Sequence, residues 1–170
     1  MELWDVQQGV KVAELLNVAN VKYVTYSADM AHVALLSKHV ITLAHAHTLQ
    51  QVAVVHETIR VKSATFDGSV LIYSTLNHIK YTLPNGDNGI LCTLDQPLYL
   101  VHVVNDTLLA LSRNHTLVKQ QIDGTEYRFK HALTNKDYAQ VLYIINNSNL
   151  LGQSIIAYLQ KKGYPEVALR

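Results

Sequence analysis

The sequence predicts degenerate blades of a partial β-propeller, followed by the first helices of an α-solenoid. One observation is an approximate internal repeat of about 40 residues, in which short strand-like runs alternate with polar turns. Another is a change in the period of the hydrophobic pattern, from two to 3.6, after the segment VKQQIDG. We therefore assign residues 1–123 to propeller blades and residues 124–170 to helical hairpins.

The repeat becomes visible when the sequence is aligned with itself. Three units start with the runs VKYVTYSADM, VKSATFDGSV and LYLVHVVNDT, at Val21, Val61 and Leu98. Each unit continues through a second strand to a turn that ends in histidine, namely His39, His78 or His115, and then begins a third strand. In the first two units a fourth strand follows, LQQVAVVHE and GILCTLD. Four short strands per unit are typical of WD40-like blades, although the Trp-Asp dipeptide is missing from its usual places.

The N-terminal stretch LWDVQQGVKVAEL fits the last two strands of a preceding blade, with Gln7-Gln8-Gly9 as their turn. This gives about three and a half blades, whereas closed propellers have about four to eight. The last residues, PEVALR, resemble a helix that has only begun. We therefore expect a piece of a longer chain, and we expect the isolated piece to self-associate through its unpaired sheet edges.

Two helices are predicted next. The segment TEYRFKHAL places Phe129, Ala132 and Leu133 on one side. In NKDYAQVLYII, apolar residues recur at i, i+3, i+4 and i+7, and Asn135 is the expected N-cap. The apolar face of this second helix is predicted to consist of Tyr138, Val141, Leu142 and Ile145.

A third helix is predicted from Leu151, Ile155 and Leu159, which recur at i, i+4 and i+8. It should end near Lys162, because Gly163 follows and the pair Lys161-Lys162 suits the negative end of a helix dipole.

The composition excludes several classes of protein. A hydrophobic content of 49% is sufficient for a core, and 14 basic against 13 acidic residues give a net charge of +1, which indicates no nucleic-acid partner. The single cysteine, Cys92, cannot form an internal disulfide, and we interpret it as a buried apolar residue in a reducing compartment. Without a membrane-spanning run or a signal peptide, the chain is expected to be cytosolic.

Nine histidines raise the hypothesis of a metal site. His45 and His47 would share one face of a strand, and either His32 or His39 would supply a third ligand. The alternative is that these are exposed or hydrogen-bonded strand histidines. Because no nucleotide-binding, hydrolase or metalloprotease motif is present, we predict no enzyme activity and no catalytic, cofactor-binding or metal-binding residues.

Several stretches resemble the coatomer alpha subunit family, from the end of its second propeller into its α-solenoid. They are VKYVTYSADMAHVALLSKH, HETIRVKSATFD, NHIKYTLPNGDNGIL, TEYRFKHAL and, most specifically, LGQSIIAYLQKKGYPEVAL. The resemblance implies a structural scaffold of the COPI vesicle coat, which acts in retrograde Golgi-to-ER and intra-Golgi transport. It implies a cytoplasmic protein, peripheral to Golgi and vesicle membranes, that assembles with other coatomer subunits, chiefly the beta-prime subunit through the solenoid.

The family reads dilysine cargo with its first propeller, which this sequence does not include, so no cargo-binding residue is carried over. Lys161-Lys162 is interpreted as a helix end, since dilysine retrieval signals act at an extreme C-terminus. Two alternatives remain open. One is a peptide-binding WD40-like propeller unrelated to coat assembly, and the other is a histidine-based enzyme that would contain metal.

Overall fold

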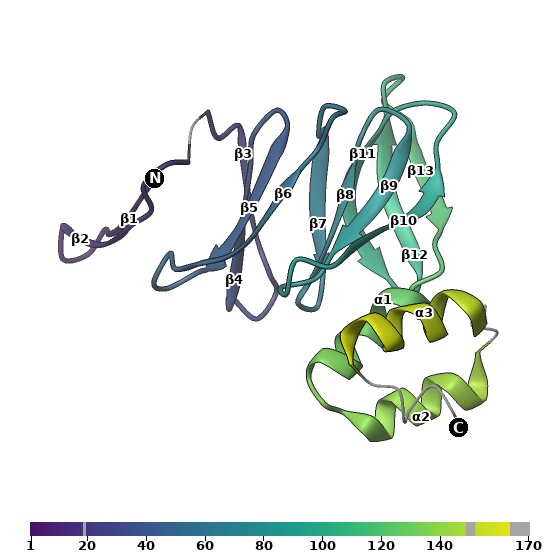
Figure 1. The fold of residues 1–170 in the computed structure, drawn as a ribbon. Helices are drawn as coiled ribbons and strands as arrows, with labels where there is room; N and C mark the ends of the chain where they lie inside the picture. The colour runs from purple at the N-terminus through teal and green to yellow at the C-terminus, as the bar shows by residue number, and fades with distance from the viewer. Residues whose placement is uncertain (19, 149–151, 164–170) are drawn as a thin grey trace. The chain divides into compact units, whose positions relative to one another are not determined.

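The structure is a computed structural model that describes residues 1–18, 20–148 and 152–163 (Figure 1). The chain divides into two compact units, Met1–Tyr127 and Arg128–Arg170. Helix α1 (Thr125–Thr134) begins in the first unit and continues in the second. Each unit is described by itself, and the assignment of blades to 1–123 and hairpins to 124–170 stays a prediction.

The first unit consists of four antiparallel sheets in which neighbouring strands follow the order of the chain. The N-terminal hairpin contains β1 (Glu2–Asp5) and β2 (Val10–Glu14). Blade 1 contains β3 (Tyr23–Tyr26), β4 (His32–Leu36), β5 (Val40–His45) and β6 (Gln51–His56). Blade 2 contains β7 (Ser63–Asp67), β8 (Val70–Ser74), β9 (His78–Thr82) and β10 (Asn88–Thr93). Blade 3 contains β11 (Leu98–Val104), β12 (Thr107–Ser112) and β13 (Leu117–Gln121). The predicted strands are confirmed, including the two-stranded start and the two four-stranded blades.

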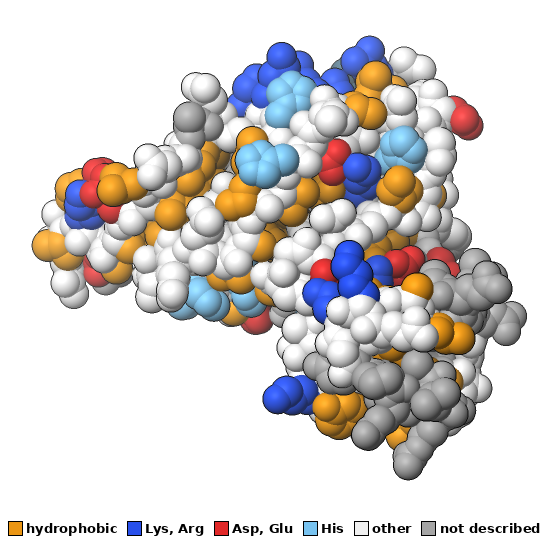
Figure 2. All heavy atoms as spheres, in the orientation of Figure 1, with side chains coloured by type: hydrophobic (Ala, Val, Ile, Leu, Met, Phe, Trp, Pro, Cys, Tyr) orange, Lys and Arg blue, Asp and Glu red, His pale blue; other side chains and the backbone are white. Residues whose placement is uncertain are grey.

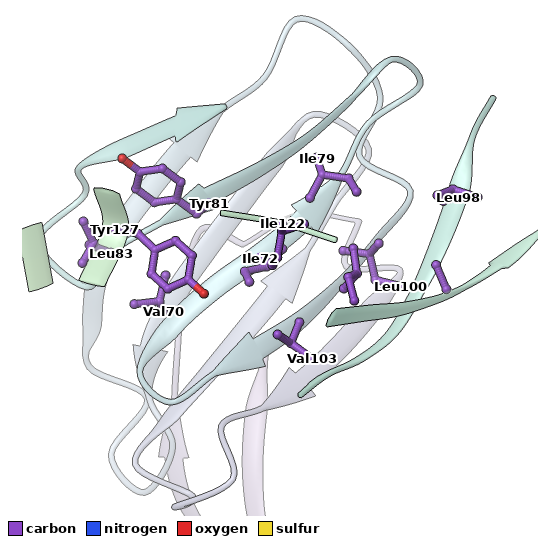
Figure 3. Close-up of a cluster of buried hydrophobic side chains, with 12 residues drawn as sticks. Val70, Ile72, Ile79, Tyr81, Leu83, Leu98, Leu100, Val103, Ile122 and Tyr127 are labelled. Carbon is purple, nitrogen blue, oxygen red and sulfur yellow. The ribbon is translucent and has the colours of Figure 1, made fainter. Parts of the chain in front are cut away.

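Blade 2 is buried on both faces, which explains why β8 is a continuous apolar run. Leu71 and Tyr73 belong to the cluster shared with blade 1, whereas Ile72 belongs to the cluster shared with blade 3. Figure 3 shows Ile72 in the second of these clusters, together with residues of blade 3 such as Leu100. Successive side chains of one strand therefore fill two different cores.

The turns of the three blades are equivalent, but their histidines are offset. The backbone N–H of Glu57 donates to the carbonyl of His39 (2.8 Å), and that of Leu94 donates to Asn77 (2.7 Å). By this register His39 corresponds to Asn77, so the expected match of His39 with His78 is wrong by one residue. His115 lies in a longer turn, where the N–H of Ser112 donates to the carbonyl four residues later (3.0 Å). The aligned histidines therefore mark equivalent turns without occupying equivalent positions.

In place of a fourth strand, blade 3 is followed by the start of α1. Gly124 is needed at this transition, because a Cβ there would lie 2.6 Å from the Tyr127 hydroxyl. Tyr127 is buried and donates a hydrogen bond to Asp67 Oδ2 (2.6 Å), while the Tyr81 hydroxyl donates to Glu126 (2.9 Å). The first residues of α1 are thus fixed to blade 2.

The second unit contains the rest of α1, α2 (Tyr138–Asn147) and α3 (Gly152–Lys162). The buried side of α1 is the predicted one, Phe129, Ala132 and Leu133. Helix α3 ends as predicted, with Lys161-Lys162 in its last turn and Gly163 at φ +82°. Leu159 is buried, whereas Leu151 and the side chain of Ile155 lie outside the described residues.

Two predictions for α2 are wrong. The N-cap is Asp137 instead of Asn135, since the Asp137 carboxylate accepts a hydrogen bond from the N–H of Gln140 (3.1 Å). The buried residues are Val141 and Ile144. Leu142 is 52% exposed and Ile145 is 39% exposed, because α2 turns the neighbouring apolar face inward.

Candidate interaction surfaces

His32 and His45 are brought together by blade 1. They lie directly opposite each other on β4 and β5, with ring centroids 5.5 Å apart. Burial lowers the pKa of His32, the neighbouring His45 lowers it further, and Asp29 opposes this change. His47 does not share this face as predicted, because β5 ends at His45 and the alternation stops there.

The three-ligand metal hypothesis gains no support from this geometry. Within residues 1–18, 20–148 and 152–163, no three His, Cys, Asp or Glu side chains form a group that could hold a metal ion. Cys92 is half-buried against the core between blades 2 and 3, and burial raises the pKa of its thiol. A raised thiol pKa disfavours the nucleophilic thiolate.

A buried polar network fixes the connection between blades 1 and 2. Glu57 leaves the end of β6 and accepts hydrogen bonds from the Tyr73 hydroxyl (2.6 Å) and from Lys80 Nζ (2.9 Å). The Glu57 side chain is 8% exposed. Burial raises the pKa of Tyr73, and the Glu57 carboxylate raises it further. Sequence reasoning missed this network, since its members lie 16 and 23 residues from Glu57.

The blades present one side-chain row to the following sheet. In blade 1 the row is Tyr23, Leu36 and Ile41, which pair across β3, β4 and β5. Leu36 and Ile41 are buried in the cluster shared with blade 2. Rows of this kind are the contacts by which adjacent propeller sheets stack.

Blade 3 presents the corresponding row, Tyr99, Leu111 and Leu117, in the same cross-strand register. Its side chains are 37%, 42% and 60% exposed, respectively. The row of blade 3 is therefore an apolar surface with the form of a blade-to-blade interface and no covering sheet among the described residues.

The comparisons with known proteins agree with this architecture. The family model described as "COPA/B second beta-propeller" matches residues 1–112, which include the N-terminal hairpin, blades 1 and 2, and most of blade 3. The chain belongs to the COPA/B second beta-propeller family.

This COPA/B propeller chain is also similar to curated proteins over nearly its whole length. It is 55% identical to coatomer subunit alpha of Saccharomyces cerevisiae over 169 residues, or 99% of this chain. It is 49% identical to the putative coatomer subunit alpha of Schizosaccharomyces pombe over 171 residues, and 42% identical to coatomer subunit alpha of Dictyostelium discoideum over 168 residues. The chain spans 14% of the length of each of these relatives.

Solved structures support the fold of the COPA/B propeller chain. The computationally designed Ika8 protein has a TM-score of 0.59 at 11% identity, covering 71% of this chain and 39% of that one. BamB from Moraxella catarrhalis has a TM-score of 0.53 at 17% identity, covering 71% of this chain and 37% of that one. No helix in the described part of the chain is long and apolar enough to cross a membrane.

Proposed function

We propose that this chain is a structural segment of a coatomer alpha subunit and acts as a scaffold in the COPI coat. The carrying observation is the 55% identity to a coatomer subunit alpha over 99% of the chain, which continues past the propeller through the helices. The transport served by this scaffold would be retrograde Golgi-to-ER and intra-Golgi traffic. The buried polar groups of this chain join blade 1 to blade 2. This structural use of polar groups suits a scaffold and not an enzyme.

The anchored start of α1 is the feature that suits a scaffold. The contacts from Tyr127 to Asp67 and from Tyr81 to Glu126 hold the first helical turn against blade 2. Such contacts fix the first turn of α1 within the propeller unit. Helical pairs that continue from this point would form an α-solenoid, in which each pair stacks on the next.

We expect the helical unit to contact a partner or a further helical repeat through the exposed apolar face of α2. Tyr138, Leu142 and Ile145 recur at i, i+4 and i+7 and are 47%, 52% and 39% exposed. A stripe of this spacing is the usual contact of one amphipathic helix with another. The beta-prime subunit of the coat, which binds through the solenoid, is the partner that we propose.

The test is affinity purification of the full-length protein from a cytosolic extract, followed by mass spectrometry. We expect a stable set of coatomer subunits in similar amounts, with beta-prime among them. The Leu142→Asp variant should lose beta-prime. The matched change Tyr143→Asp, at a 67% exposed position of α2 that lies off this stripe, should retain it.

Recovery of no coatomer subunit would contradict the scaffold function. The alternative, a peptide-binding WD40-like propeller unrelated to coat assembly, would then be favoured. Whole-coat attachment to Golgi membranes would be tested in the same preparation, by flotation of the purified coat with Golgi membranes.

A further inference from the structure

A hollow of about 280 Å³ lies where the first strands of the three blades meet. Equivalent positions on β3, β7 and β11 hold Tyr23, Ser63 and Tyr99. The equivalence follows from the register, because Tyr23 pairs with Leu36, Ser63 with Ser74, and Tyr99 with Leu111. A small serine between two tyrosines leaves an open space. Thr25, Lys62 and Ala64 complete most of its lining.

The floor of the hollow is rigid and its walls are accessible. The Ser63 hydroxyl lies 2.8 Å from that of Ser74 and accepts a hydrogen bond from the N–H of Leu100 (2.8 Å). Tyr23 stays 53% exposed although blade 2 covers Leu36, its neighbour in the same row. A following blade therefore covers the outer part of such a row and leaves the tyrosine near the propeller axis open.

The hollow lies at the basic end of the blades. The connections at this end carry the cations Lys22, Lys38, Arg60, Lys62 and Arg113. Of the acidic residues in the same connections, Glu57 is paired with Lys80, which leaves Asp95. Figure 2 shows Lys and Arg side chains gathered along the upper edge of the sheets. Within the described residues, none of these five cations forms an ion pair.

The opposite end of the blades is acidic. Its turns and strand ends carry Asp29, Asp67, Asp87, Asp106 and Asp123, and they contain no Lys or Arg. The formal net charge of +1 conceals this separation. A surface of one sign attracts ligands of the other sign and orients them as they approach.

We propose that the hollow binds a short acidic peptide segment of a partner protein. A carboxylate of the peptide pairs with Lys62, and a neighbouring apolar side chain lies between Tyr23 and Tyr99. The volume is close to the lower limit of ligand pockets, about 300 Å³, and suits one or two side chains. Tyrosine walls contribute contact area together with a hydroxyl group at little cost in side-chain entropy.

A concave, side-chain-sized hollow favours a peptide over an anionic membrane. A lipid surface would engage the exposed cations Lys38, Arg60 and Arg113 and would need no hollow. The proposal does not depend on assembly of the chain into a coat, so the purification experiment above can fail while this one succeeds.

The experiment measures binding of a fluorescent peptide to the full-length protein by anisotropy. The probe is a short peptide of alternating Glu and Leu, and its matched control carries Lys in place of each Glu. We expect the acidic peptide to bind more tightly than the basic one, with an affinity that falls as salt is added. Lys62→Glu should weaken binding by about tenfold or more, and Lys62→Gln by less.

Further variants separate the hollow from general surface charge. Tyr99→Ala should weaken the acidic peptide without changing the net charge of the protein. Lys136→Glu, an exposed lysine of the helical unit, makes the same charge change as Lys62→Glu and should leave binding unchanged. Thermal unfolding of each variant shows whether lost binding reflects lost folding.

Three outcomes would overturn the proposal. One is equal binding of the acidic and basic peptides. Another is an equal loss of binding in Lys62→Glu and Lys136→Glu, which would indicate attraction by net charge alone. The third is binding to phosphatidylserine vesicles that depends on Lys38 and Arg60, with peptide binding unaffected by Lys62→Glu and Tyr99→Ala. That result would assign the basic end to a membrane surface.

Discussion

Blades 1 and 3 present the same row of side chains in the same register, yet the aliphatic positions of the two rows have opposite exposure. Leu36 and Ile41 of blade 1 are 1% and 0% exposed, whereas Leu111 and Leu117 of blade 3 are 42% and 60% exposed. The residue types are alike, but a sheet follows blade 1, whereas no sheet covers the row of blade 3 among the described residues. In this fold, therefore, the neighbouring blade determines whether a strand residue is buried. The sequence of the residue's own strand does not.

The exposed row of blade 3 is accordingly a surface suited to a further sheet. We expect another blade of the full-length chain to cover it, as blade 2 covers blade 1. Blade 3 has three strands where blades 1 and 2 have four, so its last strand, β13, has a free edge. A strand of the covering blade could pair with this edge.

The most severe test of this comparison places a charge in each row. In the isolated 170-residue chain, Leu36→Asp should lower the free energy of unfolding by more than about 4 kcal/mol, because it buries an unpaired carboxylate. Leu117→Asp should change the free energy of unfolding by less than about 1 kcal/mol. Chemical denaturation of both variants measures the difference, and losses of similar size would contradict the comparison.

The next test removes the charge that joins blades 1 and 2. Glu57→Gln should destabilise the chain by about 3 kcal/mol, because it leaves the ammonium of Lys80 partly buried without its carboxylate. The double change Glu57→Gln with Lys80→Met should recover part of the loss. If the double variant were no more stable than Glu57→Gln alone, the ion pair would not be what holds this connection.

A third test uses the exposed row as a contact between copies. At high concentration the isolated 170-residue chain should self-associate through this row and through its free strand edges. Leu117→Lys should raise the dissociation constant by about tenfold, measured by sedimentation equilibrium. A chain that stays monomeric at high concentration would show that the row does not bind a second copy.

The smallest effect is a pH dependence of stability. It comes from His32 in blade 1, the blade whose row is covered. The folded structure lowers the pKa of His32, so protonation favours the unfolded chain. Stability should be full above the usual histidine range and should decline as pH falls through that range and below it. His45 faces His32 and strengthens this trend, while Asp29 weakens it. Thermal unfolding of His32→Gln should show a weaker acid dependence, and an unchanged pH profile would exclude His32 as its source.

The order of the strands was predictable because alternation and turn residues are local properties of the sequence. Blade membership followed from the repeat, and the end of α3 followed from Gly163. The face of α2 was not predictable, since Val141 with Ile144 and Leu142 with Ile145 are equally apolar pairs at helical spacing. Only packing against α1 and α3 selects the first pair.

The candidate surfaces were less predictable than the fold, because they depend on distant segments meeting. Glu57 lies far in sequence from Tyr73 and Lys80, and the hollow is lined by residues of three different blades. The pairing of His32 with His45 also needs the register of β4 and β5, whereas strand alternation alone suggested His47. Repeats fix which strands are neighbours but not which side chains meet across blades.

The two-sided burial of β8 also has a consequence for synthesis on the ribosome. The cluster that holds Leu71 is complete once Tyr73 has left the ribosome, whereas the cluster that holds Ile72 extends to Tyr127, which is 127 − 72 = 55 residues later. At translation rates of about 5–20 residues per second, this delay lasts about three to eleven seconds. During that interval the nascent chain displays one apolar side of a finished strand, and this is the period in which a chaperone would bind it.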